Sequence, residues 1–297
     1  MAANPRDLIS AVTGRARKLA RRDHPRVSVI RLSGVISSAA SPGRGGLNLA
    51  ALAGPIEVAF RVRDVKAVAL AINSPGGSPV QSALIHQRIR ALADEKNVPV
   101  YAFAEDVAAS GGYWLAVAAD QVYADRNSII GSIGVISAGF GFTGLIEKLG
   151  IERRLYAQGD NKSMLDPFQP EKPEDVERLH AIQKEMHESF KALVKARRGE
   201  RLPKRKDKQL FNGDIWTGNK ALDLGLIDGV GDLRGVMREK FGDKVKFKVF
   251  GPRQNWLQRR FGLSRPAEGW PAADPSDWAD NLIDALIARA HWARFGL

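Results

Sequence analysis

The sequence contains no cysteine and no long apolar run. Without cysteine, the 297-residue chain has no disulfide framework, no thiolate ligand for a metal and no cysteine nucleophile. No stretch of about 18 apolar residues occurs, so the sequence predicts no transmembrane helix. The basic residues near the start are followed by Asp23-His24-Pro25-Arg26 and not by an apolar segment, so no export signal is predicted. We therefore expect a cytoplasmic protein.

Acidic residues are fewer than basic ones. The chain has 33 Asp and Glu and 45 Lys and Arg, which gives a formal net charge of +12. Residues 1–31, 197–208 and 238–265 carry net charges of +6, +5 and +7. Such segments attract polyanions. No zinc-finger, helix-turn-helix or RNA-recognition pattern accompanies them, so we expect no specific nucleic-acid partner. We expect weak peripheral contact with anionic lipid on the inner face of the cell membrane; a purely solvated surface is the alternative.

Strand-length apolar segments alternate with breaks and helical patterns. The run Val65 to Asn73 is nearly all apolar, as in a strand buried on both faces of a parallel sheet. A breaker cluster ends it, and helical spacing follows over residues 79–94. Residues 98–104 predict another buried strand, followed by a helix over about 110–119. This alternation predicts an α/β fold with a mostly parallel sheet.

The chain divides by composition into three parts. The first is strongly basic, the second holds the strand and helix patterns, and the third begins with a segment rich in Pro, Gly, Trp and Arg. We expect a basic N-terminal arm over residues 1–26, a main domain over 27–250, and a linker with a C-terminal amphipathic helix over 251–297. That helix places Trp278, Leu282 and Leu286 on one stripe. We interpret the stripe as a packing face, with a membrane-surface helix as the alternative.

Two glycine-rich turns follow consecutive predicted strands, and ligands bind at the carboxyl ends of parallel strands. The first turn is Asn73-Ser74-Pro75-Gly76-Gly77, and the second is Ala109-Ser110-Gly111-Gly112. The second turn puts the Ser110 hydroxyl at the start of a helix, where backbone N–H groups favour a developing oxyanion. Tight packing of the turns is the purely structural alternative for both glycine pairs.

A serine nucleophile needs a base, and none of the five histidines lies between residues 87 and 179. His180 and His187 lie seven residues apart on one face of a charged helix, and we expect both to be solvated. The alternative base is a lysine made neutral by burial, because desolvation lowers the pKa of a lysine. Lys162 is the candidate, although a lone lysine in a loop is most often a surface residue.

Three motifs point to one family in combination. They are Ser110-Gly111-Gly112-Tyr113-Trp114, Gly131-Ser132-Ile133-Gly134-Val135, and the segment from Lys162 to Pro167-Phe168. Together with a later glycine-bearing segment over 213–228, they resemble the signal peptide peptidase A (SppA) family of serine peptidases. The resemblance spans roughly residues 27–232, about two-thirds of the chain.

The resemblance implies the Clp-protease/crotonase fold, in which repeated ββα units build a mostly parallel sheet, here with an added C-terminal helical extension. It implies a Ser-Lys dyad, with Ser110 as the nucleophile and Lys162 as the general base. Ser132 would orient the lysine amine by a hydrogen bond. This chemistry requires no metal and no other cofactor.

Backbone N–H groups, from Gly111 and from either Gly76 or Gly77, would form the oxyanion hole. The implied substrates are apolar peptides rich in small residues, such as released signal peptides. The implied assembly is a ring-like homo-oligomer, in which serine and lysine can come from neighbouring subunits. Two alternatives stay open: an inactive family member that acts as a binding scaffold, and a crotonase-like acyl-CoA enzyme with Glu105 or Asp106 as its base.

Overall fold

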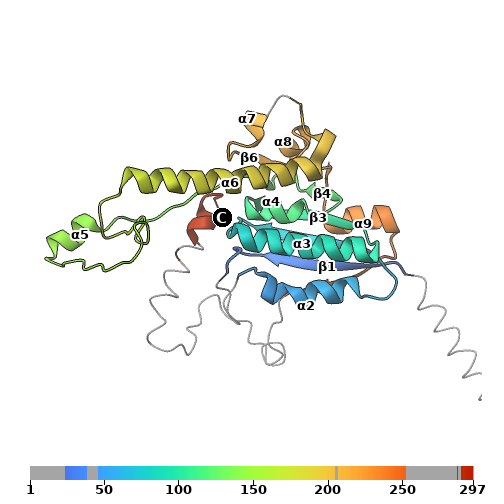
Figure 1. The fold of residues 1–297 in the computed structure, drawn as a ribbon. Helices are drawn as coiled ribbons and strands as arrows, with labels where there is room; N and C mark the ends of the chain where they lie inside the picture. The colour runs from blue at the N-terminus through green and yellow to red at the C-terminus, as the bar shows by residue number, and fades with distance from the viewer. Residues whose placement is uncertain (1–23, 39–45, 205–206, 252–285, 287–288, 297) are drawn as a thin grey trace, which may run out of the picture.

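The structure is a computed structural model that describes residues 24–38, 46–204, 207–251, 286 and 289–296. Strands and helices alternate along most of this chain (Figure 1). The strands are β1 (Arg26–Ser33), β2 (Val65–Ser74), β3 (Val100–Ala109), β4 (Gln121–Ala124), β5 (Ile129–Gly131), β6 (Ile215–Thr217), β7 (Gly229–Val230) and β8 (Lys246–Phe250). The helices are α2 (Leu49–Phe60), α3 (Pro79–Lys96), α4 (Gly111–Ala116), α5 (Thr143–Lys148), α6 (Pro173–Arg198), α7 (Asp207–Leu210), α8 (Gly218–Asp223) and α9 (Leu233–Phe241).

The strands form one sheet in the order β6-β5-β3-β2-β1-β8, with β4 paired to β3 and β7 paired to β4. Within the described chain every pairing is parallel except that of β5 with β6. The predicted α/β fold with a mostly parallel sheet is therefore confirmed.

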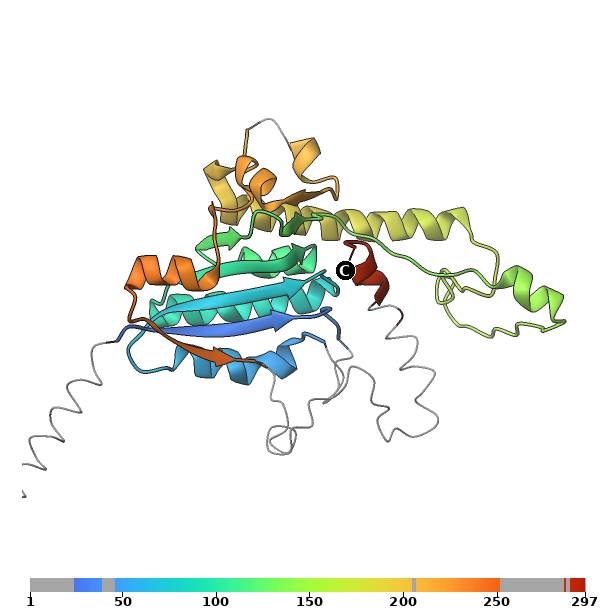
Figure 2. The same cartoon turned by 180° about the vertical axis from the view of Figure 1, so that it is seen from behind.

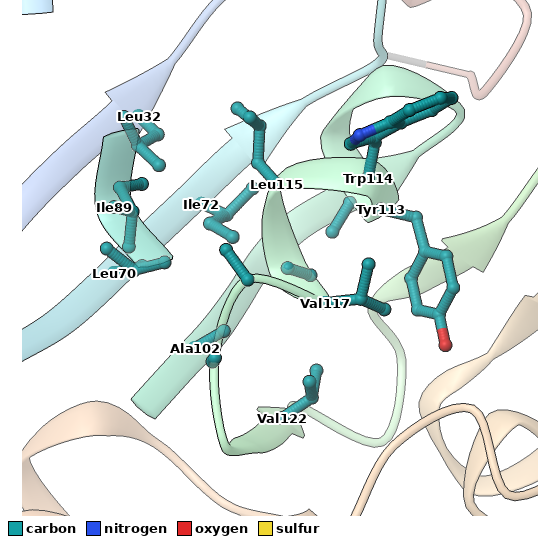
Figure 3. Close-up of a cluster of buried hydrophobic side chains, with 14 of the residues drawn as sticks. Leu32, Leu70, Ile72, Ile89, Ala102, Tyr113, Trp114, Leu115, Val117 and Val122 are labelled. Atoms are coloured by element: carbon teal, nitrogen blue, oxygen red, sulfur yellow. The ribbon is translucent and has the colours of Figure 1, made fainter. Parts of the chain in front are cut away.

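Both faces of the central strands are buried, which explains their nearly continuous apolar sequence. Because successive side chains point to opposite faces, Ile30 and Leu70 belong to one cluster and their neighbours Val29 and Ala69 to another. The first cluster packs under α2, α3 and α4, and Figure 3 shows part of it. The second packs against α9, which lies on the other face of the sheet (Figure 2).

Polar caps determine where the helices on the first face begin. Asn48 accepts a hydrogen bond from the Ala51 N–H at 2.8 Å before α2, and Ser78 accepts one from the Gln81 N–H at 3.4 Å before α3. At its other end α3 stops at Asn97, whose left-handed conformation (φ 50°) ends the helix. These local signals explain where both helices begin, and α3 begins at the residue that the sequence predicts.

β3 changes its partner midway. Residues 101–104 pair with β4, whereas residues 107–109 pair with β5, and the register with β2 shifts by two residues between them. The irregularity is held by polar side chains: Ser128 Oγ donates to the Glu105 carbonyl at 2.5 Å, and the Val107 N–H donates to Asn73 Oδ1 at 3.2 Å. The sequence predicts a strand that ends at residue 104, but the bulge allows β3 to continue to Ala109.

A buried ion pair fixes the carboxyl end of α6 to the body. Arg198, whose side chain is 2% exposed, donates to both carboxylate oxygens of Asp228 at 2.7 and 3.1 Å and to the Gly225 carbonyl at 2.9 Å. The same carboxylate accepts the Val122 N–H at 2.7 Å. A Cβ at Gly225 would lie 1.9 Å from the Arg201 carbonyl oxygen. The later glycine-bearing motif is thus explained by packing and by a charge pair that is fully hydrogen-bonded.

Residues 135–172, which we call the arm, connect β5 to α6 and extend away from the sheet with α5 (Figures 1 and 2). The arm packs on itself: the Phe142 N–H donates to the Pro167 carbonyl at 2.6 Å, and the rings of Phe142 and Phe168 stack at 5.5 Å. It is joined to the start of α6, where the Leu165 N–H donates to Asp175 Oδ2 at 3.4 Å. The arm is therefore a projection that is held together by contacts between its own residues and is joined to the start of α6.

Several predictions fall on parts of the chain outside the described residues. They concern the basic N-terminal segment, the glycine loop near residue 43, the linker, and most of the C-terminal amphipathic helix. Of that helix, Leu286 and residues 289–293 are helical in the structure. Across the described residues, no helix combines the length and the apolar character needed to cross a bilayer.

His86 on α3 gives the fold a testable pH dependence. The side chain is buried, and burial, with the nearby Arg197 charge, lowers its pKa from 6.5 to about 4. The unfolded chain takes up a proton near pH 6.5, so the free energy of unfolding should fall by up to about 3 kcal/mol as the pH drops from 6.5 toward 4. His86→Gln should remove this fall in the free energy of unfolding. Urea unfolding at about pH 7.5 and about pH 4.5 measures it. The control His180→Gln changes an exposed histidine and should keep it; an equal loss of stability in wild type and His86→Gln would contradict the prediction.

Candidate active site

Ser110 lies between β3 and α4 in a backbone conformation that few residues adopt, with φ 53° and ψ −121°. Its N–H donates to the Gly131 carbonyl at 2.8 Å, and its carbonyl accepts the Trp114 N–H at 3.0 Å. A non-glycine residue at such angles costs about 1–3 kcal/mol and persists only where its surroundings hold it. A sharp strand-to-helix turn of this kind presents a serine hydroxyl at the edge of the sheet in hydrolases. The half-buried Ser110 is thus placed as a nucleophile would be.

The two glycine-rich turns touch so closely that side chains do not fit between them. A Cβ at Gly76 would lie 2.8 Å from both the Gly111 nitrogen and the Ser110 Cβ. A Cβ at Gly112 would lie 2.3 Å from the carbonyl oxygen of Ser74. The glycines are therefore required by backbone contact between the ends of β2 and β3, and this contact brings both predicted turns into one site.

The hydrogen bonds of these turns distinguish the two candidate N–H groups of the first turn. The Gly76 N–H donates to Ser74 Oγ at 3.3 Å, and the same hydroxyl donates to a backbone carbonyl. Within the described chain, the N–H groups of Gly77 and Gly111 have no hydrogen-bond partner. They lie close together, because a Cβ at Gly111 would be 3.3 Å from the Gly77 nitrogen. Two unpaired donors thus adjoin Ser110.

Ser132 lies beside Ser110. The residues that precede the two serines, Ala109 and Gly131, are register partners on the parallel strands β3 and β5. Ser132 is buried and has a positive φ of 52°, and its N–H donates to the Asp214 carbonyl at 2.7 Å. The structure therefore brings together both serines that the sequence selects.

Lys162 lies in the arm and not at the glycine turns. It is exposed, and its backbone N–H donates to the Gly159 carbonyl at 3.1 Å. Since the arm extends away from the sheet (Figure 2), the structure does not bring Lys162 to Ser110 within one chain. Nor do the described residues of this chain supply the burial expected around a neutral lysine amine.

The prediction that His187 is solvated is wrong. His187 is half-buried on α6, and its Nε2 lies 3.2 Å from the Ile133 carbonyl oxygen, one residue after Ser132. His180, the other histidine of this predicted pair, is exposed, as expected. The charged sequence of α6 hides this contact, because only the packing of the helix on the body selects one of the two histidines.

The carboxylates of the acyl-CoA alternative lie elsewhere. Glu105 forms an ion pair with Arg31 at 2.8 Å, and Asp106 accepts a hydrogen bond from the Asn73 side chain at 2.7 Å. Both line a hollow of about 560 Å³ on the face of the sheet that carries α9. Neither of the two carboxylates that this alternative requires therefore lies beside the Ser110 hydroxyl as a base. In the part of the chain that the structure describes, no three His, Asp or Glu side chains gather as a candidate metal site.

The aromatic residues of the Ser110 motif anchor α4. The buried Tyr113 hydroxyl donates to the Leu226 carbonyl at 2.7 Å, and burial raises the pKa of this phenol. Figure 3 shows the hydroxyl pointing away from the hydrophobic cluster. The Trp114 ring stacks on Phe190 of α6 at 4.6 Å. These contacts hold the short helix, and with it the turn at Ser110.

The sequence profile of peptidase family S49 matches residues 93–244, a range that contains Ser110, Ser132 and Lys162. The chain belongs to peptidase family S49. The resemblance to SppA-type peptidases is thereby confirmed.

Curated proteins similar to this S49 chain carry two kinds of name. It is 35% identical over 211 residues to the chloroplastic serine protease SPPA of Arabidopsis thaliana, covering 70% of this chain and 31% of that protein. It is 34% identical over 167 residues to a putative signal peptide peptidase SppA of Enterococcus faecium, covering 56% and 48%. A Brucella abortus (strain 2308) protein named Na(+)/H(+) antiporter NhaA is 49% identical over 277 residues, covering 91% and 37%. The S49 chain thus spans about a third to a half of these relatives.

Among solved structures, a mutant of the 1510-N membrane-bound stomatin-specific protease aligns with a TM-score of 0.46 at 16% identity. The alignment covers 77% of this S49 chain and 99% of that one.

The contact between the glycine turns predicts different effects of alanine at two helical glycines. Gly112→Ala puts a Cβ against the Ser74 carbonyl oxygen, so it should lower the free energy of unfolding by about 1–3 kcal/mol. Gly144→Ala, in α5, meets nothing within 4 Å and should leave the free energy of unfolding unchanged or raise it by up to about 1 kcal/mol. Urea unfolding of both variants checks this, and equal stability of the two would contradict the close approach.

Proposed function

We propose that this S49 chain is a serine endopeptidase with a Ser-Lys dyad. The observation that carries the proposal is the pair of unpaired N–H groups, from Gly77 and Gly111, beside the half-buried Ser110. Donors held in this way stabilise the oxyanion that develops when a serine attacks a carbonyl. The choice of Gly77 over Gly76 follows from the bond that occupies the Gly76 N–H.

The lysine amine acts as general base and then as general acid. In its neutral form it accepts the Ser110 proton as the hydroxyl oxygen attacks the scissile carbonyl, and it then protonates the leaving amine. Water hydrolyses the acyl-enzyme with the same amine as base. We assign the amine to Lys162, and we assign its orientation to the Ser132 hydroxyl beside the nucleophile.

A second copy of the chain would supply the lysine. The arm that carries Lys162 exposes large apolar side chains, among them Phe140 (81% exposed), Leu149 (63%) and Tyr156 (91%). Exposed apolar groups gathered on one projection mark an interaction surface. Repeated around a ring, such a contact would place each arm at the Ser110 turn of its neighbour and bury the lysine amine there.

For substrates we propose extended apolar peptides rich in small residues, of which released signal peptides are an example. The N–H groups next to Ser110 belong to glycines, which carry no side chain of their own to obstruct an extended peptide main chain. The name of the Enterococcus relative, putative signal peptide peptidase SppA, agrees with such a substrate class. An inactive scaffold is the alternative, and it would bind such peptides without turnover.

Replacing the dyad tests the function and its sharing between subunits. Ser110→Ala and Lys162→Ala should each lower the turnover of an alanine-rich peptide by at least about 10³-fold, because nucleophile and base act as a unit. If neighbours share each site, subunits of the two variants mixed at equal amounts and allowed to exchange should recover about a quarter of wild-type turnover, since one site in four receives both groups.

The outcomes separate the two parts of this proposal. Wild-type turnover in Ser110→Ala contradicts the peptidase function. Two inactive variants whose mixture stays inactive contradict the shared site only. Labelling of Ser110 by a fluorophosphonate, measured in wild type and in Lys162→Ala, reports the nucleophile independently of peptide binding.

The arm predicts the state of assembly. Phe140→Glu adds a charge to the exposed apolar surface of the arm and should shift the protein toward monomer in sedimentation velocity, with loss of turnover. The matched control is Val58→Glu, which changes an exposed apolar residue of α2 (48% exposed) and should leave the assembly intact. Unchanged sedimentation of Phe140→Glu would contradict the arm as the contact between copies.

A further inference from the structure

His187 joins α6 to the turn that carries Ser132. Its Nε2 lies 3.2 Å from the Ile133 carbonyl oxygen. Because a carbonyl oxygen only accepts hydrogen bonds, the imidazole must carry a proton on Nε2 and donate it. The side chain of Ile133 is fully buried, so the peptide unit that His187 holds belongs to the body and not to the arm.

The backbone on either side of this hydrogen bond is tightly turned. Ser132 has a φ of 52°, and the Gly134 N–H donates to the Ser132 carbonyl at 3.0 Å. Directly after this turn the chain leaves the body as the arm. The peptide unit whose carbonyl faces His187 also carries the Gly134 N–H, so its rotation would break the bond to the Ser132 carbonyl that closes this turn and would change the direction in which the arm departs.

The same face of α6 holds the nucleophile helix. Phe190 lies one helical turn after His187 and stacks on Trp114, four residues after Ser110. At its end, α6 is fixed by the buried pair of Arg198 and Asp228. The helix thus provides a rigid support from which His187 can set the Ser132 turn relative to Ser110.

We propose that His187 is a positioning residue for the peptidase reaction. By donating to the Ile133 carbonyl, it fixes the turn over residues 131–134, so that the Ser132 hydroxyl points at the lysine amine when the arm of a neighbour is in place. The inference rests on the proposed Ser-Lys function. It assigns to a hydrogen-bond donor on α6 a role that neither the nucleophile nor the base can supply.

A pair of variants of equal size separates hydrogen bonding from packing. In His187→Gln the side-chain amide can still donate to the Ile133 carbonyl, whereas in His187→Glu a carboxylate faces that carbonyl and cannot donate. We expect His187→Gln to keep kcat within about 3-fold of wild type, and His187→Glu to lower kcat by about 10- to 100-fold with little change in KM, because the misplaced group acts in the chemical step. His187→Leu, which has no donor, should behave as His187→Glu does.

The control lies on the same helix. His180 is exposed, and its ring contacts only the Gln183 side chain among the described residues, so His180→Glu should leave kcat unchanged. Urea unfolding and sedimentation velocity are measured for every variant, and the kcat comparison is made among those that fold and assemble as wild type does. If His187→Glu and His187→Leu do not fold, the result for His187→Gln decides, because a lowered kcat there overturns the proposal.

The result that overturns the inference differs from the one that overturns the function. Wild-type kcat in His187→Glu, with Ser110→Ala inactive, refutes the positioning role alone. Equal losses of kcat in His187→Gln and His187→Glu also refute it, because the donor would then not matter. Wild-type turnover in Ser110→Ala refutes the peptidase function itself, whatever the His187 variants do.

Discussion

The rest of the site depends on the direct backbone contact between the ends of β2 and β3. A Cβ at Gly76 would meet the second turn and a Cβ at Gly112 would meet the first, so the two turns touch because these two residues have no side chain. Such a contact needs adjacent parallel strands whose carboxyl ends reach the same edge. It also needs the bulge after residue 104, since only the continued β3 carries Ser110 to that edge. From this contact follow the strained Ser110 backbone and the two unpaired N–H groups.

Helix α6 connects the Ser110 turn, the Ser132 turn and the arm, which the contact between the glycine turns does not join. Its buried Arg198–Asp228 pair fixes one end to β4 and to the loop before β7, and Phe190 presses on α4 through Trp114. Because a buried charge pair is costly to break, the helix keeps one position relative to the sheet. The opposite end of α6 directly follows the arm in the chain, and the arm leaves the body at the Ser132 turn. One rigid helix therefore links the Ser110 turn, the Ser132 turn and the arm that carries Lys162.

The strands and helices near the site were largely predictable, because local patterns control them. The apolar run of β2 and the helical spacing of α3 are visible in sequence, and both elements form where predicted. The end of β3 was not predictable, because Glu105 and Asp106 interrupt the apolar run that marks a buried strand. Their side chains are tolerated at the bulge by Arg31 and Asn73, partners that lie on other strands. Pairing across a sheet cannot be derived from a pattern within one segment.

The sequence by itself determined the class of fold, the absence of thiol chemistry, and the pair of glycine turns with Ser110, because composition, periodicity and motif spacing are properties of the chain alone. Only the tertiary structure shows that the Gly76 N–H meets the Ser74 hydroxyl, whereas the Gly77 N–H has no partner within the described chain. It also decided the positions of Lys162, out in the arm, and of His187, against the body. The difference between the two glycines depends on how one turn is folded, and the positions of Lys162 and His187 depend on how segments distant in sequence pack. Neither can be derived from the local pattern of residues.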